Sequence, residues 1–345
     1  MRHVLFIIAL TASYSSSLHA DAIDVERAIP ENCAEFLQKA TLNAQKSSER
    51  ATTANNGTVI EVGQVAFVPV EQLWAGQREV SAENARTKLF SSAADYGLDR
   101  NGDSWALPND GGRSLLEISD PLLVVRFKNR YVIVDGHHHA VMNAFVGGRT
   151  AAVKVLYDFS SLTESQLWQE LLAKRLVHLP GESVESIMQN RPSLASLRDN
   201  PNRYLASILG AKVDLSFQSE RVRVNGVRAT NDALWVKIND GVPFVEFMIA
   251  EVLTRAGINY DPDWGDNVPR EIVNKSRAAL LQARERGDFP ELDSIILLES
   301  KKQAKKIGKD EDALADLVRD FLTGHGISCS ILNRQYAEAW ASRAK

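Results

Sequence analysis

The residues best suited to chemistry lie in one short run, in which Asp135 and Gly136 are followed by His137, His138 and His139. A glycine here allows a backbone conformation that other residues resist, and the residues after it can open a helix. The free N–H groups and positive dipole end of a helix favour an anion. Histidines add donors when protonated and an acceptor when neutral. The run therefore predicts a phosphate-binding turn.

The same run allows three other interpretations. In the first, Asp135 orients a histidine that acts as a general base, and the sequence does not decide which histidine that is. In the second, one or two histidines bind a divalent metal together with a distant carboxylate. Three neighbours on a helix cannot converge on one ion, because consecutive residues point about 100° apart. In the third, the turn is a plain helix cap. We favour the anion site, and the metal and any other cofactor stay unknown.

Strands and a helix are expected on either side of this run. Two hydrophobic runs predict a β-hairpin with a polar turn at 128–130, and these runs are Leu122–Phe127 and Tyr131–Val134. The helix after Gly136 ends at Gly147, and Ala152–Phe159 predicts another strand. The second hydrophobic strand of the hairpin thus leads directly into the histidines, which makes a strand–turn–helix unit.

Four segments, taken together, resemble the ParB-like nuclease family of the ParB/sulfiredoxin superfamily. They occur in the family's order, cover roughly residues 60–260, and are Val68–Val80, Tyr131–Ala140, Asp199–Ala206 and Pro243–Ala250. The resemblance implies a small mixed sheet and a phosphate-binding helix N-terminus at the histidine run. Many relatives carry an arginine where His139 stands, so phosphate binding here is expected to be weaker or pH-dependent.

The resemblance also extends the set of candidate site residues. It implies that Gln77 and Arg78 lie close to the histidine turn as phosphate ligands, and that Glu79 is a catalytic acid or base. Arg126 is placed near the site by the expected hairpin turn, where it could guide a polyanion. Arg203 is either a phosphate ligand or one half of an ion pair with Glu246 that docks the helical half of the chain onto the sheet.

The pattern along the chain predicts an α+β protein, with a ParB/sulfiredoxin-like mixed sheet domain followed by a mostly helical domain. Thr163 and Gln166 form a capping box at the start of the helical half. Further helices are expected at Glu31–Gln45, Ala82–Ser91, Leu194–Leu209, Phe244–Ala256, Glu271–Arg286 and Glu311–Leu322. The expected divisions are a signal peptide (1–22), an N-terminal helix and linker (23–58), the ParB-like domain (59–160), the helical domain (161–285) with an inserted hairpin at 221–238, and a helical tail (286–345).

The first residues predict export. A basic start is followed by the apolar run Val4–Ala12 and a small, polar stretch, which is the order of a secretory signal peptide. Cleavage is expected before Asp21 or Ile23, so the protein would be periplasmic or secreted, with no membrane-spanning segment in the mature chain. In an oxidising compartment Cys33 and Cys329 either form one disulfide or remain two separate thiols.

Composition limits the function classes. With 345 residues and a formal net charge of −4, the chain does not hold nucleic acid by bulk positive charge, so a polyanion site must be local. Three functions stay open: a phosphodiester hydrolase acting on nucleic acid, a nucleotide-dependent phosphotransferase or nucleotide hydrolase, and a non-catalytic phosphate or nucleic-acid binding module. The expected partner is accordingly nucleic acid or a nucleotide, and the oligomeric state is not predicted.

Overall fold

The computed structural model describes residues 27–28, 32–50, 60–92, 99–101, 104–106, 121–218, 221–228, 233–238, 244–289, 292, 295–298, 300–307 and 310–324. The expected signal peptide and Cys329 lie outside these residues, so export and the disulfide stay predictions. No helix in the described part of the chain is long and apolar enough to cross a membrane.

A five-stranded mixed sheet forms the centre of the first half of the chain. Its strands, in spatial order, are β2 (Val65–Pro69), β9 (Thr150–Asp158), β7 (Leu122–Phe127), β8 (Arg130–Asp135) and β3 (Leu73–Ala75). The β7–β8 hairpin is antiparallel, as its two hydrophobic runs predicted, while β8 pairs with β3 in parallel. This hairpin brings the histidine run to one end of the sheet.

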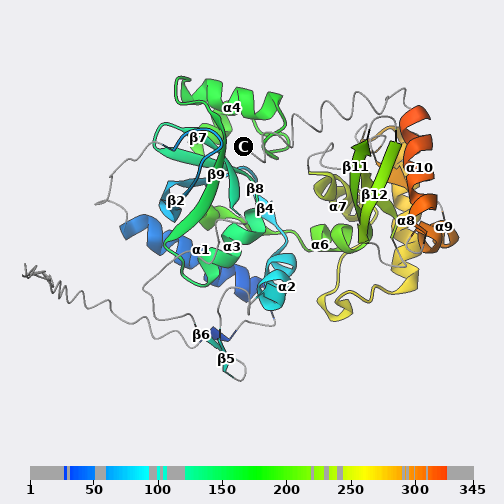
Figure 1. The fold of residues 1–345 in the computed structure, drawn as a ribbon. Coiled ribbons are helices and arrows are strands. Elements are labelled where there is room, and N and C mark those ends of the chain that lie inside the picture. The colour runs from blue at the N-terminus through cyan, green and yellow to red at the C-terminus, as the bar shows by residue number, and fades with distance from the viewer. Residues whose placement is uncertain are drawn as a thin grey trace, which may run out of the picture.

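Helices cover both faces of this sheet, which explains why its central strands are continuous hydrophobic runs. Val124 and Ile133 pack on one face among α1 (Cys33–Arg50), α2 (Ala82–Ser92) and α3 (His137–Phe145). Val125 and Val132 pack on the other face against α4 (Glu164–Ala173) and α5 (Val184–Gln189). Figure 1 shows α4 on the opposite side of the sheet from α1 and α3. We call the elements from β1 (Arg27–Ala28) to β10 (Arg198–Asp199) the first lobe.

The domain boundary expected near residue 160 falls inside this first lobe. The capping box is present, since the Thr163 side chain accepts from the Gln166 backbone and Gln166 reaches back to Thr163. The helix that it starts, α4, packs on the sheet through Leu167, Trp168 and Leu171. The change from strands to helices in the sequence therefore marks a new layer of the same lobe.

Short elements complete the first lobe. The helical turn η2 (Val70–Gln72) joins β2 to β3, and β4 (Glu79–Val80) pairs in parallel with β10. Strands β1 (Arg27–Ala28), β5 (Asp99–Asn101) and β6 (Ser104–Ala106) form a small separate sheet, and η3 (Leu194–Ser196) precedes β10.

The second lobe combines five α-helices and the short helical turn η5 (Pro262–Trp264) with a four-stranded sheet, among the residues that the structure describes. The helices are α6 (Pro201–Ile208), α7 (Val245–Arg255), α8 (Arg270–Arg286), α9 (Lys301–Ile307) and α10 (Glu311–Gly324). The sheet order is β12 (Arg221–Arg228), β11 (Gly210–Gln218), β13 (Trp235–Ile238) and β14 (Ile296–Leu297). The α+β class is thus confirmed, and the second lobe contains more sheet than one inserted hairpin.

Two local predictions in this region were wrong. Asn225–Gly226 does not form a hairpin turn: both residues lie within β12, where Asp214 pairs with Gly226 and Leu215 with Val224, so Asn225 is the extra residue of a β-bulge. Leu194–Leu209 is not one helix. Asn200 caps α6 by accepting from the Arg203 backbone, and Pro201 occupies the first turn, so the helix begins there and the residues before it form η3 and β10.

Candidate phosphate site at the amino end of helix α3

Two glycines bring the ends of strands β3 and β8 together. The strands are parallel, with Leu73 opposite Tyr131 and Ala75 opposite Ile133, so both carboxyl ends lie at one edge of the sheet. A Cβ on Gly76 would lie 2.2 Å from the backbone oxygen of Ile133. Gly136 has φ +93°, and a Cβ there would lie 2.9 Å from Leu122 Cδ2. Both positions therefore require glycine.

His137 joins the two strand ends. It is buried, and its Nε2 accepts a hydrogen bond from the Gly76 backbone N–H at 3.0 Å. Because a backbone N–H can only donate, this nitrogen carries no proton and the ring is neutral. Burial, with the nearby Arg203 charge, lowers the pKa of His137 to about 3. His137 therefore fixes the geometry of the site and is a poor base near neutral pH.

His138 contacts the second lobe. It is also buried, and its Nε2 lies in hydrogen-bond contact with the Arg203 guanidinium. An arginine donates and does not accept, so His138 is the acceptor. Burial, and then the charges of Arg203 and Lys88, hold its pKa well below the ordinary value. Like His137, His138 is a neutral imidazole at physiological pH.

Arg203, a half-buried residue, brings a positive charge to the first turn of α3. Its guanidinium lies 4.3 Å from the centre of the Phe247 ring, and that ring stacks on His178 with 4.5 Å between centroids. Burial lowers the pKa of Arg203, while the charges of Glu246 and Asp135 raise it. Glu246 therefore acts on Arg203 through its charge, but both residues belong to the second lobe (α6 and α7), so this interaction does not dock that lobe onto the sheet as the sequence suggested. The direct contact of Arg203 with the first lobe is with His138.

The outer side of the turn holds groups of both signs. Lys88 Nζ lies 3.5 Å from His139 Nε2. Asp135 is exposed, and its Oδ1 accepts from the Gly136 backbone N–H at 2.8 Å. Two cations, Lys88 and Arg203, therefore flank the amino end of a nine-residue helix, with one exposed carboxylate beside them. This combination suits a phosphate group and a proton acceptor.

The segment after Gly76 lies near the turn, but its side chains are engaged in other contacts. Gln77 is buried, and its Nε2 donates to the Glu79 backbone oxygen at 2.6 Å. Arg78 forms a two-pronged ion pair with Glu182 at 3.0 and 2.8 Å. Glu79 Oε2 accepts from Asn200 Nδ2 at 2.7 Å. Arg78 thus ties this segment to the stretch just before α5, and Glu79 ties it to Asn200 at the start of α6.

Arg126 does not lie near the histidine turn, which corrects the expectation from the sequence. Within the hairpin it pairs with Tyr131, whereas Asp135 pairs with Leu123, so Arg126 is at the opposite end of β7. Its guanidinium binds the Asp158 carboxylate on β9. The error arose because the hairpin turn, residues 128–129, was taken to adjoin the site, although a six-residue strand separates them.

Sequence reasoning missed three contributors to the site, namely Lys88, His178 and Phe247. Lys88 and His178 lie outside the four family-like segments and approach only through the fold. Phe247 belongs to one of those segments, and its place next to Glu246 is the signal that could have pointed to it. Within the described residues no group of three or more His, Cys, Asp and Glu side chains gathers as a metal would require.

A comparison with protein families matches the part of the chain that builds this site. Residues 68–218 match the family described as "Putative ParB-like nuclease". The matched ParB-like segment runs from β2 to β11 and contains both glycines, the three histidines and Arg203. α7, which carries Phe247, lies beyond it.

Comparison with individual proteins adds less. The crystal structure of protein Atu1540 from Agrobacterium tumefaciens is 18% identical over 64% of this chain and 94% of its own, with a TM-score of 0.40. None of the curated proteins matches the chain significantly.

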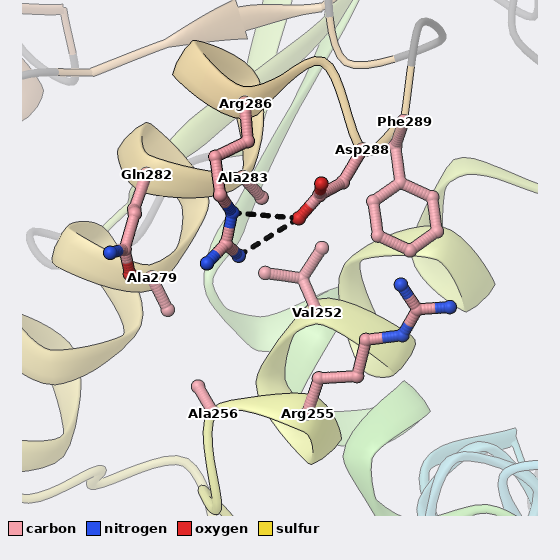
Figure 2. Close-up of a pocket in the computed structure, with 9 residues that line it drawn as sticks. All are labelled: Val252, Arg255, Ala256, Ala279, Gln282, Ala283, Arg286, Asp288 and Phe289. Atoms are coloured by element: carbon pink, nitrogen blue, oxygen red, sulfur yellow. Dashed lines mark hydrogen bonds and ion pairs between the residues drawn. The ribbon is translucent and has the colours of Figure 1, made fainter.

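Figure 2 shows a small cavity between α7 and α8 whose charged side chains are engaged in contacts with their neighbours. Its volume is about 100 Å³. Arg286 is paired with Asp288 at 2.8 Å, and Arg255 lies 4.9 Å from the centre of the Phe289 ring. The charged groups of this cavity therefore serve to pack the two helices.

Proposed function

We propose that this protein is a phosphodiester hydrolase that acts on nucleic acid. One observation carries the proposal: Arg203, from the second lobe, lies against His138 in the first turn of α3, where helix N–H groups also converge. A guanidinium beside a helix amino end suits a phosphate better than either group alone. The match of residues 68–218 to a nuclease family supports the same chemistry.

The side chains would divide the work as follows. Arg203, Lys88 and the backbone of α3 hold the phosphate and stabilise the charge that develops during attack. Asp135, the exposed carboxylate at the turn, accepts the proton of the attacking water. His138 positions Arg203, and His137 fixes the turn to Gly76. Neither histidine is the base, because their pKa values lie far below neutrality.

The test is a cleavage assay on the chain without residues 1–22. Single- and double-stranded DNA and RNA are incubated with it, with and without a divalent metal. We expect Arg203→Ala to lower turnover on the order of a hundredfold. Asp135→Asn should lower kcat more than it changes KM, because it removes a proton acceptor and leaves the phosphate ligands.

The matched control is Arg126→Ala, which also removes a half-buried arginine but at the far end of β7. It should keep full turnover. Equal losses in Arg126→Ala and Arg203→Ala, at equal melting temperatures, would show that the α3 site is not where cleavage occurs.

A second candidate is a non-catalytic nucleic-acid binding module, and the state of the histidines favours it. Both buried histidines are locked as hydrogen-bond acceptors with depressed pKa values, so neither titrates near neutral pH. Oligonucleotide binding that depends on Arg203, without cleavage of any polymer, would support this candidate over the hydrolase.

Export is a separate proposal that rests on the first 22 residues alone. Amino-terminal sequencing of protein recovered outside the cytoplasm should give Asp21 or Ile23. Material that begins at Met1 would contradict it.

A further inference from the structure

A second cavity, of about 300 Å³, lies beside the proposed phosphate site and is not used by it. This volume is at the lower end for small-molecule pockets. Both lobes contribute to its lining, which includes Glu79, Asp199, Asn200, Thr254, Asn259 and Tyr260.

The lining of this cavity is polar but not suited to phosphate. No Lys or Arg is among its described lining residues, although Arg198 lies 3.4 Å from Glu79 Oε1 at its edge, and the lining contains two carboxylates, Glu79 and Asp199. Burial raises the pKa of Asp199, as do the nearby charges of Glu83 and Glu79. A carboxylate accepts hydrogen bonds from amino groups, and an amide such as Asn259 both donates and accepts. Nucleobases present this combination: cytosine offers its N4 amino group, and adenine its N6 amino group beside an acceptor.

The chain places this cavity within one nucleotide's reach of the phosphate site. Glu79 follows Gly76 by three residues, so at full extension the two lie at most about 11 Å apart. The Gly76 N–H binds His137. On the other side, Asn200 is the amino-terminal cap of α6, and its Oδ1 accepts from the backbone N–H of Arg203 at 3.2 Å. The same two segments thus line both the phosphate site and the cavity.

We propose that this cavity receives an unstacked nucleobase bearing an exocyclic amino group, from the strand whose phosphate lies at Arg203. In a duplex the edge of the base that carries this group is already paired, and enzymes that read it use single strands or extrude the base. The substrate class is therefore single-stranded nucleic acid with an amino-bearing base (adenine, cytosine or guanine) next to the bound phosphate. This inference rests on the proposed function of the α3 site.

The experiment measures binding of labelled single-stranded 12-mers of dA, dC and dT, and of one duplex, by fluorescence anisotropy at one salt concentration without divalent metal. We expect oligo(dA) and oligo(dC) to bind about tenfold tighter than oligo(dT), since only they offer amino groups to the carboxylates. The duplex should bind more weakly than oligo(dA) or oligo(dC).

Two variants report on the cavity and one serves as control. Glu79→Gln removes a carboxylate but keeps an oxygen for Asn200, and should reduce the preference over oligo(dT) to near unity. Asn259→Ala, at an exposed residue, should reduce it without altering the melting temperature. Glu185→Gln changes an exposed glutamate on α5 and should keep the preference.

The outcomes separate this inference from the proposed function. If Arg203→Ala weakens binding of all three oligonucleotides but wild type binds them equally, the base pocket is wrong and the phosphate site stands. If the preference survives in both Glu79→Gln and Asn259→Ala, the base lies elsewhere. If Arg203→Ala changes no affinity, the phosphate site itself is wrong.

Discussion

The guanidinium of Arg203 on α6 donates to the buried ring of His138 at the amino end of α3, and this contact joins the two lobes at the proposed site. The Arg203 guanidinium also lies over the Phe247 ring, and the negative charges of Glu246 and Asp135 act on it. His138 therefore acts through Arg203, as a positioning residue, and this role can be separated from direct chemistry.

His138→Ala should lower turnover, or phosphate affinity if there is no turnover, on the order of a hundredfold, because Arg203 loses its acceptor. His138→Gln should restore part of the function, since its amide oxygen can also accept from Arg203. Lys302→Ala, at an exposed lysine of α9, should have little effect beyond weak, salt-screened attraction. A His138→Ala protein that folds normally and keeps full function would show that the turn is only a helix cap.

Acid should destabilise the fold at pH values that are still too high for most carboxylates to be protonated. Burial lowers the pKa of His178 to about 4 and of His137 to about 3. The unfolded chain takes up these protons near pH 6.5 while the folded chain does not, so stability is full above pH 6.5 and is lost as the pH falls toward 4. For each histidine, the free energy of unfolding should fall by about 1.4 kcal/mol for every pH unit of acidification in this window.

His178→Phe isolates one of these contributions. It keeps an aromatic ring between Phe244 and Phe247 but removes the titrating group. Urea unfolding between pH 4 and 7 should give a shallower slope for this variant than for wild type. Identical slopes would show that His178 does not stay neutral in the folded chain.

Replacing a glycine by alanine should lower the free energy of unfolding more at Gly76, which is crowded, than at Gly181, which is open. Gly76→Ala brings a Cβ within 2.2 Å of the backbone oxygen of Ile133, so the two strand ends must separate. We expect a loss of several kcal/mol in the free energy of unfolding, as for other severe overpacking. The control is Gly181→Ala, where φ is +72° but no atom lies within 4 Å. It should cost about 1–2 kcal/mol, and equal losses for the two variants would contradict the close approach.

The Cys33 thiol should be unreactive in the folded, reduced protein. Burial, and then its hydrogen bond to Glu83 Oε2 at 2.7 Å, raise the pKa of Cys33 to about 12. In a Cys329→Ser variant, which leaves Cys33 as the single cysteine, alkylation by iodoacetamide at pH 8 should be slow until urea unfolds the chain. Rapid alkylation of the folded protein would show that the thiol is accessible and ionises readily.

The sequence predicted the strands and the turn of the site because their signals are local. The hydrophobic runs of β7 and β8 and the glycine before the histidines specify a strand–turn–helix whatever surrounds them. The role of each histidine was not predictable, because it depends on Gly76 and Arg203, which are 61 and 65 residues away from His137 and His138. Burial, which lowers the pKa of both rings, also depends on these distant parts of the chain.

The wrong predictions also have local causes. Asn225–Gly226 has the composition of a tight turn, but the long neighbouring strand β11 offers partners on both sides of it, so the pair forms a bulge. Arg126 was placed by its neighbourhood in the sequence, although the length of a strand carried it away from the site.

The position of α6 determines the shortest fragment of the chain that can form the proposed site. Its arginine completes the proposed phosphate site, yet its own hydrophobic side packs with α7 and α8 in the second lobe. A gene fragment that stops at residue 160 would encode the histidine turn without its main cation, and one that stops after α6 would leave Tyr204 and Leu205 without their core. Recombination between relatives would therefore have to exchange the histidine turn and α6 as one inherited unit.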